Sequence, residues 1–294
     1  MKALVTGAAG FIGSHLVRRL LEQGHAVFAL DKKPIHEWPM FVTGAHWVRS
    51  VDVCRLCESW AINESRFEKI DVIFHLAAES RIQPSFRYPM LCVNSNTTGT
   101  AAMLELARLR GCKVVYAGSS TADDDVTKNV YALTKKQGED LCLTYHRCFG
   151  VPVSIARFYN VYGPRQVESG RYATVIGIFE KQWQEGRKLT VTGMGTQRRD
   201  FTHVSDIVDG LLAMSTSETF HNIISLGTGR NHSIEDVARM FVPQSQILYI
   251  PRPPGESEVT LADCRIAEHE LGWKAKHRLE DYVKAVLDMK KTEE

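Results

Sequence analysis

Residues 1–14, MKALVTGAAGFIGS, decide the fold of this chain. The apolar run at 3–5 is long enough for one buried strand. Gly7, Gly10 and Gly13 follow with the spacing G-x-x-G-x-x-G, and from Phe11 onwards apolar residues recur with the period of a helix. The sequence therefore predicts a strand, a tight glycine turn and a helix in direct succession.

This turn has the composition of a phosphate-binding site. Gly7 permits the turn, Gly10 lets a phosphate approach the backbone, and Gly13 lets the helix lie close to the sheet. The turn exposes backbone N–H groups and the helix N-terminus adds partial positive charge, so the two together suit a pyrophosphate. Three glycines alone are weak support, because many turns contain them for conformational reasons only.

A second apolar run at 26–30 ends at Asp31. An acid about 20 residues beyond such a glycine turn is typical of dinucleotide-binding folds, where it binds the adenosine ribose. A carboxylate there favours the free 2′-hydroxyl of NAD and repels the 2′-phosphate of NADP, whereas the neighbouring Lys32 and Lys33 act in the opposite direction. We therefore expect a dinucleotide site with NAD as the cofactor.

The composition excludes several other classes of protein. The 294 residues suffice for one large α/β domain with a smaller lobe, and the formal net charge of +2 comes without a basic block, so nucleic acid is not expected as a partner. No apolar run approaches the ~18 residues of a membrane span. The chain starts with its first strand, so we expect no signal peptide and a cytoplasmic protein.

The seven cysteines are scattered through the chain. Cys54 and Cys57 form a C-x-x-C pair, which occurs in zinc and redox sites, but no second pair or histidine cluster completes a metal site. We expect ordinary reduced cysteines and no metal.

Apolar runs alternate with helical patterns through the first half of the chain, which predicts a doubly wound parallel (Rossmann) sheet of the α/β class. After Gly170 this rhythm changes. We expect an NAD-binding domain at 1–165, to which 200–230 returns, and a smaller, mostly C-terminal α/β lobe at 166–294. Expected strands are 46–51, 72–76, 114–117, 153–158, 189–191 and 221–226, and expected helices are 84–110, 174–185, 205–214, 233–241 and 279–290.

Several polar or small residues lie where these strands end. Asp52 follows the strand at 46–51 and is placed either to accept a hydrogen bond from an adenine amino group or to cap a helix. Ala77 and Ala78 after the next strand suit a backbone packed against a flat cofactor. Asn96 lies inside a predicted helix, where its amide is expected to bind backbone or cofactor.

Tyr131 and Lys135 are spaced i, i+4 on a predicted helix and share one face. A lysine beside a tyrosine favours the phenolate and lowers the phenol pKa, which suits Tyr131 as a general base. The pattern Y-x-x-x-K is common by chance, and the alternative is an exposed pair on a helix. A strand that ends at Ser119, a short distance upstream, makes the pattern more specific.

Together these residues resemble the extended short-chain dehydrogenase/reductases, in particular the nucleotide-sugar epimerases and dehydratases. The resemblance covers nearly the whole chain and follows the family order. It rests on TGAAGFIGSH, Asp31, HLAA, Asn96 with Gly99-Thr100, YALTK, RFYNVYGPRQ, RRDF with the following VSD, LADCRIAEHELGW and the terminal LED.

The resemblance implies a role for each matching residue. Ser119 is implied as the catalytic hydroxyl, Tyr131 as the base and Lys135 as its electrostatic helper. Residues implied to bind NAD are Gly7, Gly10, Phe11, Ile12, Gly13, Asp31, Asp52, Val53, Leu76, Ala77, Ala78, Asn96, Tyr131, Lys135 and Tyr159. Residues implied to bind the nucleotide-diphosphate sugar are Ser80, Ser119, Ser120, Asn160, Arg199, Arg252 and Thr260, with the arginines suited to the diphosphate because a guanidinium donates bidentate hydrogen bonds.

Three departures from the family pattern concern the sugar and base pockets. The usual aromatic–glycine step and long loop after the serine are replaced by Ala122 and three aspartates, so Tyr131 arrives early. The family arginine position is occupied by Pro253, with Arg252 one residue before it. Thr192 stands where an aromatic residue usually precedes the glycine of the base-binding turn.

The implied reaction is NAD-dependent epimerisation of a nucleotide-diphosphate sugar at C4 through a 4-keto sugar, with tightly bound NAD and a UDP-sugar favoured. The type expected is a UDP-glucose or UDP-N-acetylglucosamine 4-epimerase, because Thr260 resembles a small gate residue beside the C2 substituent. A 4,6-dehydratase, a decarboxylase or a 4-keto reductase remains an alternative, although no acid adjoins Ser119-Ser120-Thr121 as dehydratases require. A non-catalytic NAD-binding sensor is the remote alternative.

The helices at 89–110 and 131–148 carry apolar residues on more than one face, and the family pairs these helices between subunits. We therefore expect a homodimer, with burial inside one subunit as the other explanation of the same pattern. The apolar residues concerned are Met103, Leu104, Leu106, Leu141, Leu143 and Tyr145.

Overall fold

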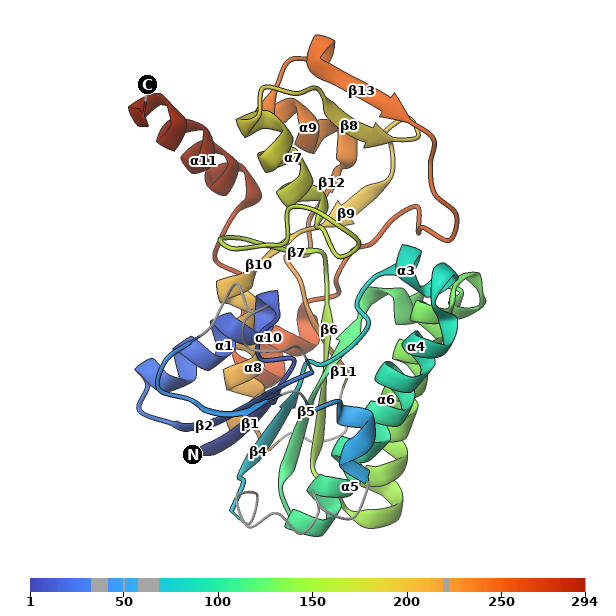
Figure 1. Cartoon of the computed structure of the whole chain (residues 1–294), viewed down its shortest axis with the longest axis vertical. Helices are drawn as coiled ribbons and strands as arrows, with labels where there is room; N and C mark the ends of the chain where they lie inside the picture. The colour runs from blue at the N-terminus through green and yellow to red at the C-terminus, as the bar shows by residue number, and fades with distance from the viewer. Residues whose placement is uncertain (33–41, 50, 58–68, 219–222, 294) are drawn as a thin grey trace. The chain divides into compact units, whose positions relative to one another are not determined.

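A computed structural model describes residues 1–32, 42–49, 51–57, 69–218 and 223–293 (Figure 1). Seven strands form one sheet in the order β11-β6-β5-β4-β1-β2-β3, and the pairs from β3 to β5 are parallel. This confirms the predicted Rossmann sheet. The strands are β1 (Lys2–Thr6), β2 (Ala26–Asp31), β3 (His46–Arg49), β4 (Val72–His75), β5 (Lys113–Ser119), β6 (Val153–Phe158) and β11 (Ile223–Leu226).

Helices cover both faces of this sheet, with α1 on one face and α5 and α6 on the other (Figure 1). The described α-helices before β6 are α1 (Phe11–Glu22), α3 (Ile82–Arg87), α4 (Pro89–Val93), α5 (Gly99–Arg110) and α6 (Val130–Phe149), and α8 (Val204–Thr216) follows later in the chain. Short helical turns are η2 (Val53–Cys57), the π-helical η4 (Asn94–Thr98), η5 (Ser120–Asp123) and η6 (Val126–Lys128).

The stretch at 84–110 is mostly helical, as the sequence predicted, and the structure divides it into α3, α4, η4 and α5. The first break is at Tyr88, whose backbone angles are φ −132° and ψ 61°. Pro89 follows it, and the residue before a proline is driven out of the helical region by the proline ring. The second irregularity is the π-helical turn that contains Asn96.

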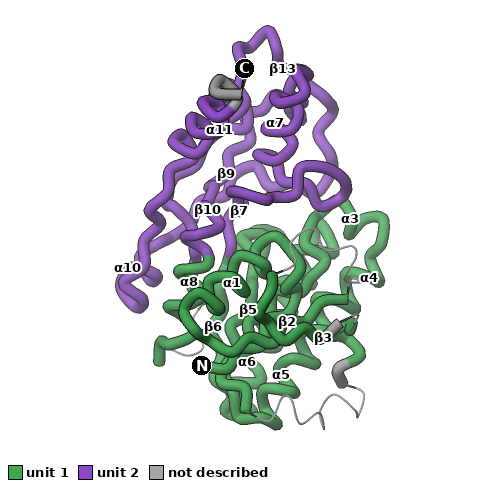
Figure 2. The backbone as a smooth tube through the Cα atoms, turned by 60° about the vertical axis from the view of Figure 1, so that its left-hand side comes forward, with its two compact units in different colours: residues 1–157, 208–224 green, residues 158–207, 225–294 purple. Residues whose placement is uncertain are grey.

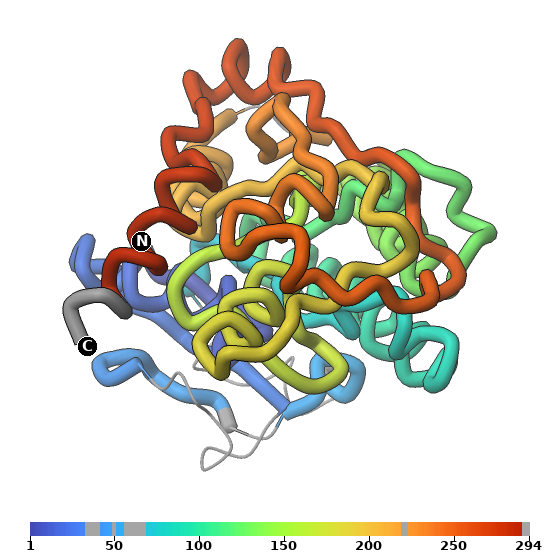
Figure 3. The backbone as a smooth tube through the Cα atoms, turned by 90° about the horizontal axis from the view of Figure 1, so that it is seen from above, coloured from blue at the N-terminus to red at the C-terminus, as the bar shows by residue number. Residues whose placement is uncertain are grey.

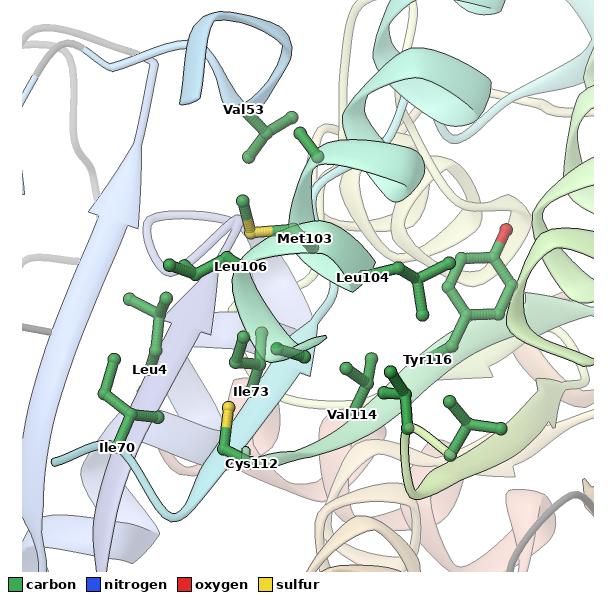
Figure 4. Close-up of a cluster of buried hydrophobic side chains, with 14 of the residues drawn as sticks. Leu4, Val53, Ile70, Ile73, Met103, Leu104, Leu106, Cys112, Val114 and Tyr116 are labelled. Carbon is green, nitrogen blue, oxygen red and sulfur yellow. The ribbon is translucent and has the colours of Figure 1, made fainter. Parts of the chain in front are cut away.

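The core of the sheet lies under α5 (Figure 4). Met103 and Leu104 are fully buried there with Leu4 of β1 and Ile73 of β4. A buried leucine side chain contributes about 1.5–3 kcal/mol to folding, so these contacts fix α5 on the sheet. Among the residues named for a dimer interface, Leu106 is also in this core, and Leu141, Leu143 and Tyr145 are partly buried against it. Burial within one subunit therefore accounts for this apolar pattern, and the homodimer stays a prediction.

The chain divides into two compact units (Figure 2). Unit 1 comprises Met1–Arg157 and Val208–Ile224, and unit 2 comprises Phe158–Ile207 and Ser225–Glu294. These bounds differ by several residues from the predicted 1–165, 200–230 and 166–294. The assignment of one unit to NAD and the other to the nucleotide sugar stays a prediction.

In unit 2, segments that are far apart in the sequence lie side by side (Figure 3), and short strands pair there. β13 pairs with β8 and β12 with β9, although the sequence predicted neither β12 nor β13. Ser233 accepts a hydrogen bond from the Asp236 N–H at 3.0 Å and is the N-cap of α9. The elements are β7 (Val161–Tyr162), α7 (Val175–Gln184), β8 (Leu189–Thr192), β9 (Arg198–Asp200), β10 (Thr202–His203), β12 (Asn231–Ser233), α9 (Ile234–Phe241), η7 (Gln244–Gln246), β13 (Ile247–Ile250), α10 (Arg265–Leu271) and α11 (Leu279–Glu293).

Among the described residues, no helix has the length and apolar composition needed to cross a membrane.

Candidate active site

The glycine turn forms as the sequence predicts, between β1 and α1 of unit 1. Gly7 has φ +67°, and a Cβ there would lie 2.8 Å from the Ala77 nitrogen. A Cβ at Gly13 would lie 2.2 Å from the Gly7 carbonyl oxygen, so α1 packs directly on the turn. Gly10 is exposed and is the N-cap of α1 without any side-chain cap. Because the first N–H groups of a helix have no partner within the helix, this end suits a pyrophosphate.

Asp31 closes the other side of this turn. Its carboxylate is buried and accepts a hydrogen bond from the Ala9 N–H at 3.0 Å, which fixes the acid beside the turn. The ammonium group of Lys32 lies 2.8 Å from the carboxylate of Glu79, so this lysine is paired with an acid of the same unit. Lys33 lies outside the described residues. The arrangement fits a dinucleotide whose ribose approaches Asp31.

Asn96 holds the loop after β4. Its side-chain oxygen accepts from the Glu79 N–H at 2.8 Å, and its amide donates to the Glu79 carbonyl at 3.1 Å and to Thr134 Oγ1 at 3.0 Å. The backbone role considered for this residue is therefore present in the structure. With both amide protons donated within the protein, any cofactor contact is left to the oxygen.

A buried histidine network that sequence reasoning missed lies beneath the same edge of the sheet. Thr6 Oγ1 accepts from the Ala77 N–H at 3.1 Å and lies 2.8 Å from His75 Nδ1, while His75 Nε2 lies 3.1 Å from Thr100 Oγ1. Thr100 in turn donates to the Asn96 carbonyl at 2.6 Å. This chain of donors places the His75 proton on Nε2. Burial lowers the pKa of His75 to about 3, so the ring is neutral.

Ser119 and Tyr131 come together at the end of β5 and the start of α6. Ser119 is buried, Tyr131 is half-buried, and the neighbouring Ser119 hydroxyl acts to lower the pKa of Tyr131. Burial is the larger influence and raises the pKa of Tyr131 above its usual value, while the positive charge of Arg81 opposes this rise. The structure thus joins the two predicted catalytic hydroxyls in unit 1.

Lys135 is buried and contacts the end of β5, and its predicted effect on the pKa of Tyr131 stays a prediction. Its ammonium group donates to the Ala117 carbonyl at 2.8 Å and lies 5.2 Å from the centre of the Tyr116 ring. Burial lowers the pKa of Lys135 to about 8. Here the lysine joins α6 to the last residues of β5. Helical spacing places the two residues on one face but does not decide which neighbour the ammonium contacts.

The short segment after Ser119 is held by a buried ion pair that the sequence analysis did not identify. Arg157 of β6 donates to both carboxylate oxygens of Glu139, at 2.8 and 2.7 Å, and Glu139 is fully buried. The same guanidinium pairs with Asp123, one of the aspartates that replace the family's usual loop. This pairing fixes η5, which begins directly after Ser119.

Unit 2 brings two of the predicted substrate residues together. The Asn160 amide donates to Thr260 Oγ1 at 3.3 Å and to the Asp200 carbonyl at 3.1 Å. The backbone of Asn160 has φ +26°, which is uncommon for a residue other than glycine. Asp200 is fully buried and accepts hydrogen bonds from Thr228, Gly229 and Ala262. The Thr260 hydroxyl is therefore held within a rigid cluster.

Two predicted diphosphate ligands, Arg199 and Arg252, lie in one neighbourhood of unit 2. Arg199 is buried and lies 3.5 Å from the Glu256 carboxylate, and Arg252 pairs with Glu258 and donates to the Glu256 and Ser257 carbonyls at 3.1 Å. Burial lowers the pKa of Arg199, and the charge of Arg252 contributes to the same effect. Two like charges brought close together suit an anion between them.

Two of the remaining predicted site residues, Asp52 and Tyr159, make hydrogen bonds within the protein. Asp52 accepts from the Cys54 N–H at 3.1 Å at the start of η2, so the capping role is present and the adenine contact stays a prediction. Tyr159 is buried, with its hydroxyl 3.3 Å from that of Ser225. Val53 is buried, Ser80 is exposed, and Phe11, Ile12, Leu76, Ala77, Ala78 and Ser120 are half-buried.

The cysteines show no feature of a metal or redox site in the part of the chain that is described. Cys54 donates to the Asn94 carbonyl, and burial raises its pKa to about 12, whereas metal ligands are thiolates. The Cys57 side chain lies outside the described part. In the described ranges, no three His, Cys, Asp or Glu side chains are grouped to hold a metal ion.

A parallel sheet with a glycine turn, an acid at the end of β2, a serine at the end of β5 and a tyrosine at the start of α6 is typical of a short-chain dehydrogenase/reductase. Residues 3–227 match the family described as the NAD dependent epimerase/dehydratase family. The chain belongs to this family of NAD-dependent enzymes.

Several characterised proteins are similar along the whole chain. The UDP-glucuronate 4-epimerase of Thermodesulfobacterium geofontis is 32% identical, over 98% of this chain and 95% of that protein. UDP-glucuronic acid decarboxylase 1 of Xenopus tropicalis is 30% identical, over 95% of this chain and 70% of that protein. The UDP-glucuronic acid 4-epimerase of Bacillus cereus, solved with UDP-glucuronic acid and NAD, has a TM-score of 0.83 and 28% identity, with both chains fully covered.

Proposed function

We propose that this chain is an NAD-dependent epimerase that inverts C4 of a UDP-linked hexose. The observation that carries the proposal is that Ser119, at the end of β5, and Tyr131, at the start of α6, lie in the same unit as the glycine turn and Asp31. Similarity to the UDP-glucuronate 4-epimerases supports it.

In this proposal the cofactor accepts a hydride from C4 and returns it to the opposite face of the 4-keto sugar. Tyr131 removes the proton of the C4 hydroxyl and Ser119 donates a hydrogen bond to the same oxygen. Lys135 holds the end of β5 to α6 through the Ala117 carbonyl, and so fixes the distance between the two hydroxyls. Because burial raises the pKa of Tyr131, the base depends on nearby positive charge, such as that of Arg81, to lose its proton.

Arg199 and Arg252 of unit 2 are proposed to bind the diphosphate. In the structure Arg199 faces Glu256 and Arg252 pairs with Glu258. When a diphosphate binds, the two arginines would exchange these carboxylates for phosphate groups. Asn160 and Thr260 are proposed to contact the rest of the nucleotide sugar.

The hexose is proposed to be UDP-glucuronate, UDP-glucose or UDP-N-acetylglucosamine. The first is favoured by the named relatives. The last is favoured by the small side chain of Thr260, which leaves space for an N-acetyl group.

A UDP-glucuronate decarboxylase is the second candidate, because relatives with that name are about as similar as the epimerase. Both reactions oxidise C4 first, and they differ in the fate of the C6 carboxylate. A 4,6-dehydratase is disfavoured, because Ser120 and Thr121 stand where an acid would be needed.

The test is to incubate the purified protein with UDP-glucuronate, UDP-glucose, UDP-N-acetylglucosamine and the corresponding dTDP- and GDP-sugars, with NMR detection of products. Inversion at C4 with C6 retained supports the epimerase, and loss of C6 as carbon dioxide supports the decarboxylase. Bound NAD without turnover of any sugar would instead support a binding protein.

A further inference from the structure

The lysine that follows Asp31 is held by a carboxylate from another segment of unit 1. Lys32 comes directly after β2, and its ammonium group lies 2.8 Å from the carboxylate of Glu79, which follows β4. In the sheet β2 and β4 lie on opposite sides of β1, the strand that leads into the glycine turn. The ion pair therefore joins the two segments that flank the phosphate-binding turn.

Within this pair, Glu79 is fixed more firmly than Lys32. Asn96 binds both the N–H and the carbonyl group of the Glu79 backbone, at 2.8 and 3.1 Å. The Glu79 side chain is only 5% exposed, whereas that of Lys32 is 42% exposed. A buried carboxylate that loses its cation is destabilised, because nothing then compensates its charge. Lys32 can therefore leave this pair only at a cost to Glu79.

A cation beside Asp31 bears on the choice between NAD and NADP. The Asp31 carboxylate favours the free 2′-hydroxyl of NAD, whereas a nearby basic side chain accommodates the 2′-phosphate of NADP in dinucleotide-binding folds. Lys32 has the charge for that second role and is next to Asp31 in the sequence. Its ammonium group is instead engaged by Glu79.

We propose that Glu79 is a specificity-determining residue, which holds Lys32 back from a 2′-phosphate and thereby strengthens the preference of this site for NAD over NADP. Binding of NADP through Lys32 would leave the buried Glu79 carboxylate without its cation, and binding of NAD carries no such cost. The inference concerns the cofactor alone and does not depend on which sugar is the substrate.

Two substitutions separate the roles of the pair. Glu79→Gln removes the carboxylate charge with little change of shape, and the bonds from Asn96 to the backbone remain possible. Lys32→Gln removes the ammonium group. The double variant distinguishes an effect of Glu79 through Lys32 from direct repulsion of the phosphate, because direct repulsion persists without the lysine. Glu79→Ala replaces the glutamine variant if the latter does not fold.

The chain contains a matched control pair. Lys128 Nζ lies 2.8 Å from the Asp124 carboxylate, and the Lys128 side chain is 41% exposed, close to the value for Lys32. Both residues lie between β5 and α6, outside the glycine turn. Asp124→Asn therefore removes the carboxylate from an ion pair of similar length and lysine exposure, and is expected to leave the cofactor preference unchanged.

The experiment measures the relative affinity for the two cofactors without any turnover. Purified protein is incubated with NAD and NADP at several ratios until the bound ratio is constant, and the bound nucleotides are then separated from free ones and quantified by chromatography. Glu79→Gln is expected to shift the affinity ratio about fivefold towards NADP, the upper end for an ion pair with an exposed partner. Lys32→Gln and the double variant are expected to stay within about twofold of wild type. The shift should shrink in about 1 M salt, which screens a charge contact.

Three outcomes overturn the proposal. The first is an unchanged ratio in Glu79→Gln, including weaker binding of both cofactors by one common factor, which a merely structural role would produce. The second is an equal shift in the double variant, because Glu79 would then act without Lys32. The third is the same shift in Asp124→Asn. If the predicted shift appears and no sugar is epimerised, the proposed reaction fails while the role of Glu79 stands.

Discussion

The ion pair between Glu139 and Arg157 gives a sharp test of how the segment after Ser119 is held. Arg157 contacts two acids, and their exposure differs: the Glu139 side chain is 0% exposed and that of Asp123 is 51% exposed. Glu139→Leu and Asp123→Asn therefore remove a buried and an exposed partner from the same guanidinium.

The exposed fractions of the two acids set the expected loss in the free energy of unfolding. Removing one partner of a buried pair costs about 3–5 kcal/mol, because the other charge stays buried without compensation. Asp123 still accompanies Arg157 in Glu139→Leu, so we expect about 3 kcal/mol, the lower end of this range. Asp123→Asn breaks a pair with an exposed acid and is expected to cost at most about 1 kcal/mol. Arg157→Leu leaves the fully buried carboxylate alone and is expected to be the most damaging of the three.

The double variant Glu139→Leu/Arg157→Leu is expected to cost less than Arg157→Leu alone, because two apolar side chains leave no buried charge.

The assay is hydrogen exchange with mass spectrometry in increasing urea, read on peptides from β5 and α6. Local opening energies are preferable to a single melting curve, because a chain with two units need not unfold in one step. Equal costs for Asp123→Asn and Glu139→Leu, or a double variant as costly as the sum of the singles, would refute this account of the pair.

Four further outcomes follow from the described contacts. Tyr131→Phe is expected to lose about 10²–10⁴-fold in kcat and still bind NAD, and near-wild-type turnover would contradict its role as the base. Burial lowers the pKa of His75 from 6.5 to about 3, so the stability gained by keeping this ring neutral is complete above pH 6.5 and is lost as the pH falls towards 3. This stability amounts to about 4–5 kcal/mol, so acid unfolding of His75→Leu should show a correspondingly weaker pH dependence. Thr260→Tyr is expected to lower kcat/KM for UDP-N-acetylglucosamine relative to UDP-glucose, and an unchanged ratio would show that Thr260 does not face the sugar. The chain is expected to be a homodimer at micromolar concentration, which light scattering checks directly; a monomer mass would agree with the burial of Leu106 and Met103 inside one subunit.

Local sequence determined the order of elements and the class of fold. The run at 3–5, Gly7 and Gly13 produce the strand, turn and helix by local effects, because Gly7 has φ +67° and a Cβ at Gly13 would collide with the Gly7 carbonyl oxygen. The N-cap at Ser233 is equally local. Spacing along the chain also placed Ser119 and Tyr131 on neighbouring elements, at the end of β5 and the start of α6.

Only the tertiary structure decided which groups meet across elements. Lys135 shares a helix face with Tyr131, yet its ammonium group contacts Ala117 of β5, because burial against the strand offers a carbonyl acceptor there. The His75 network joins Thr6 and Thr100, and the ion pair joins Glu139 to Arg157 and Asp123, all from separate elements. A single sequence does not show how distant segments are aligned with one another. The partner of a buried polar group therefore becomes defined only when the sheet and helices pack, and the same holds for the protonation of Tyr131.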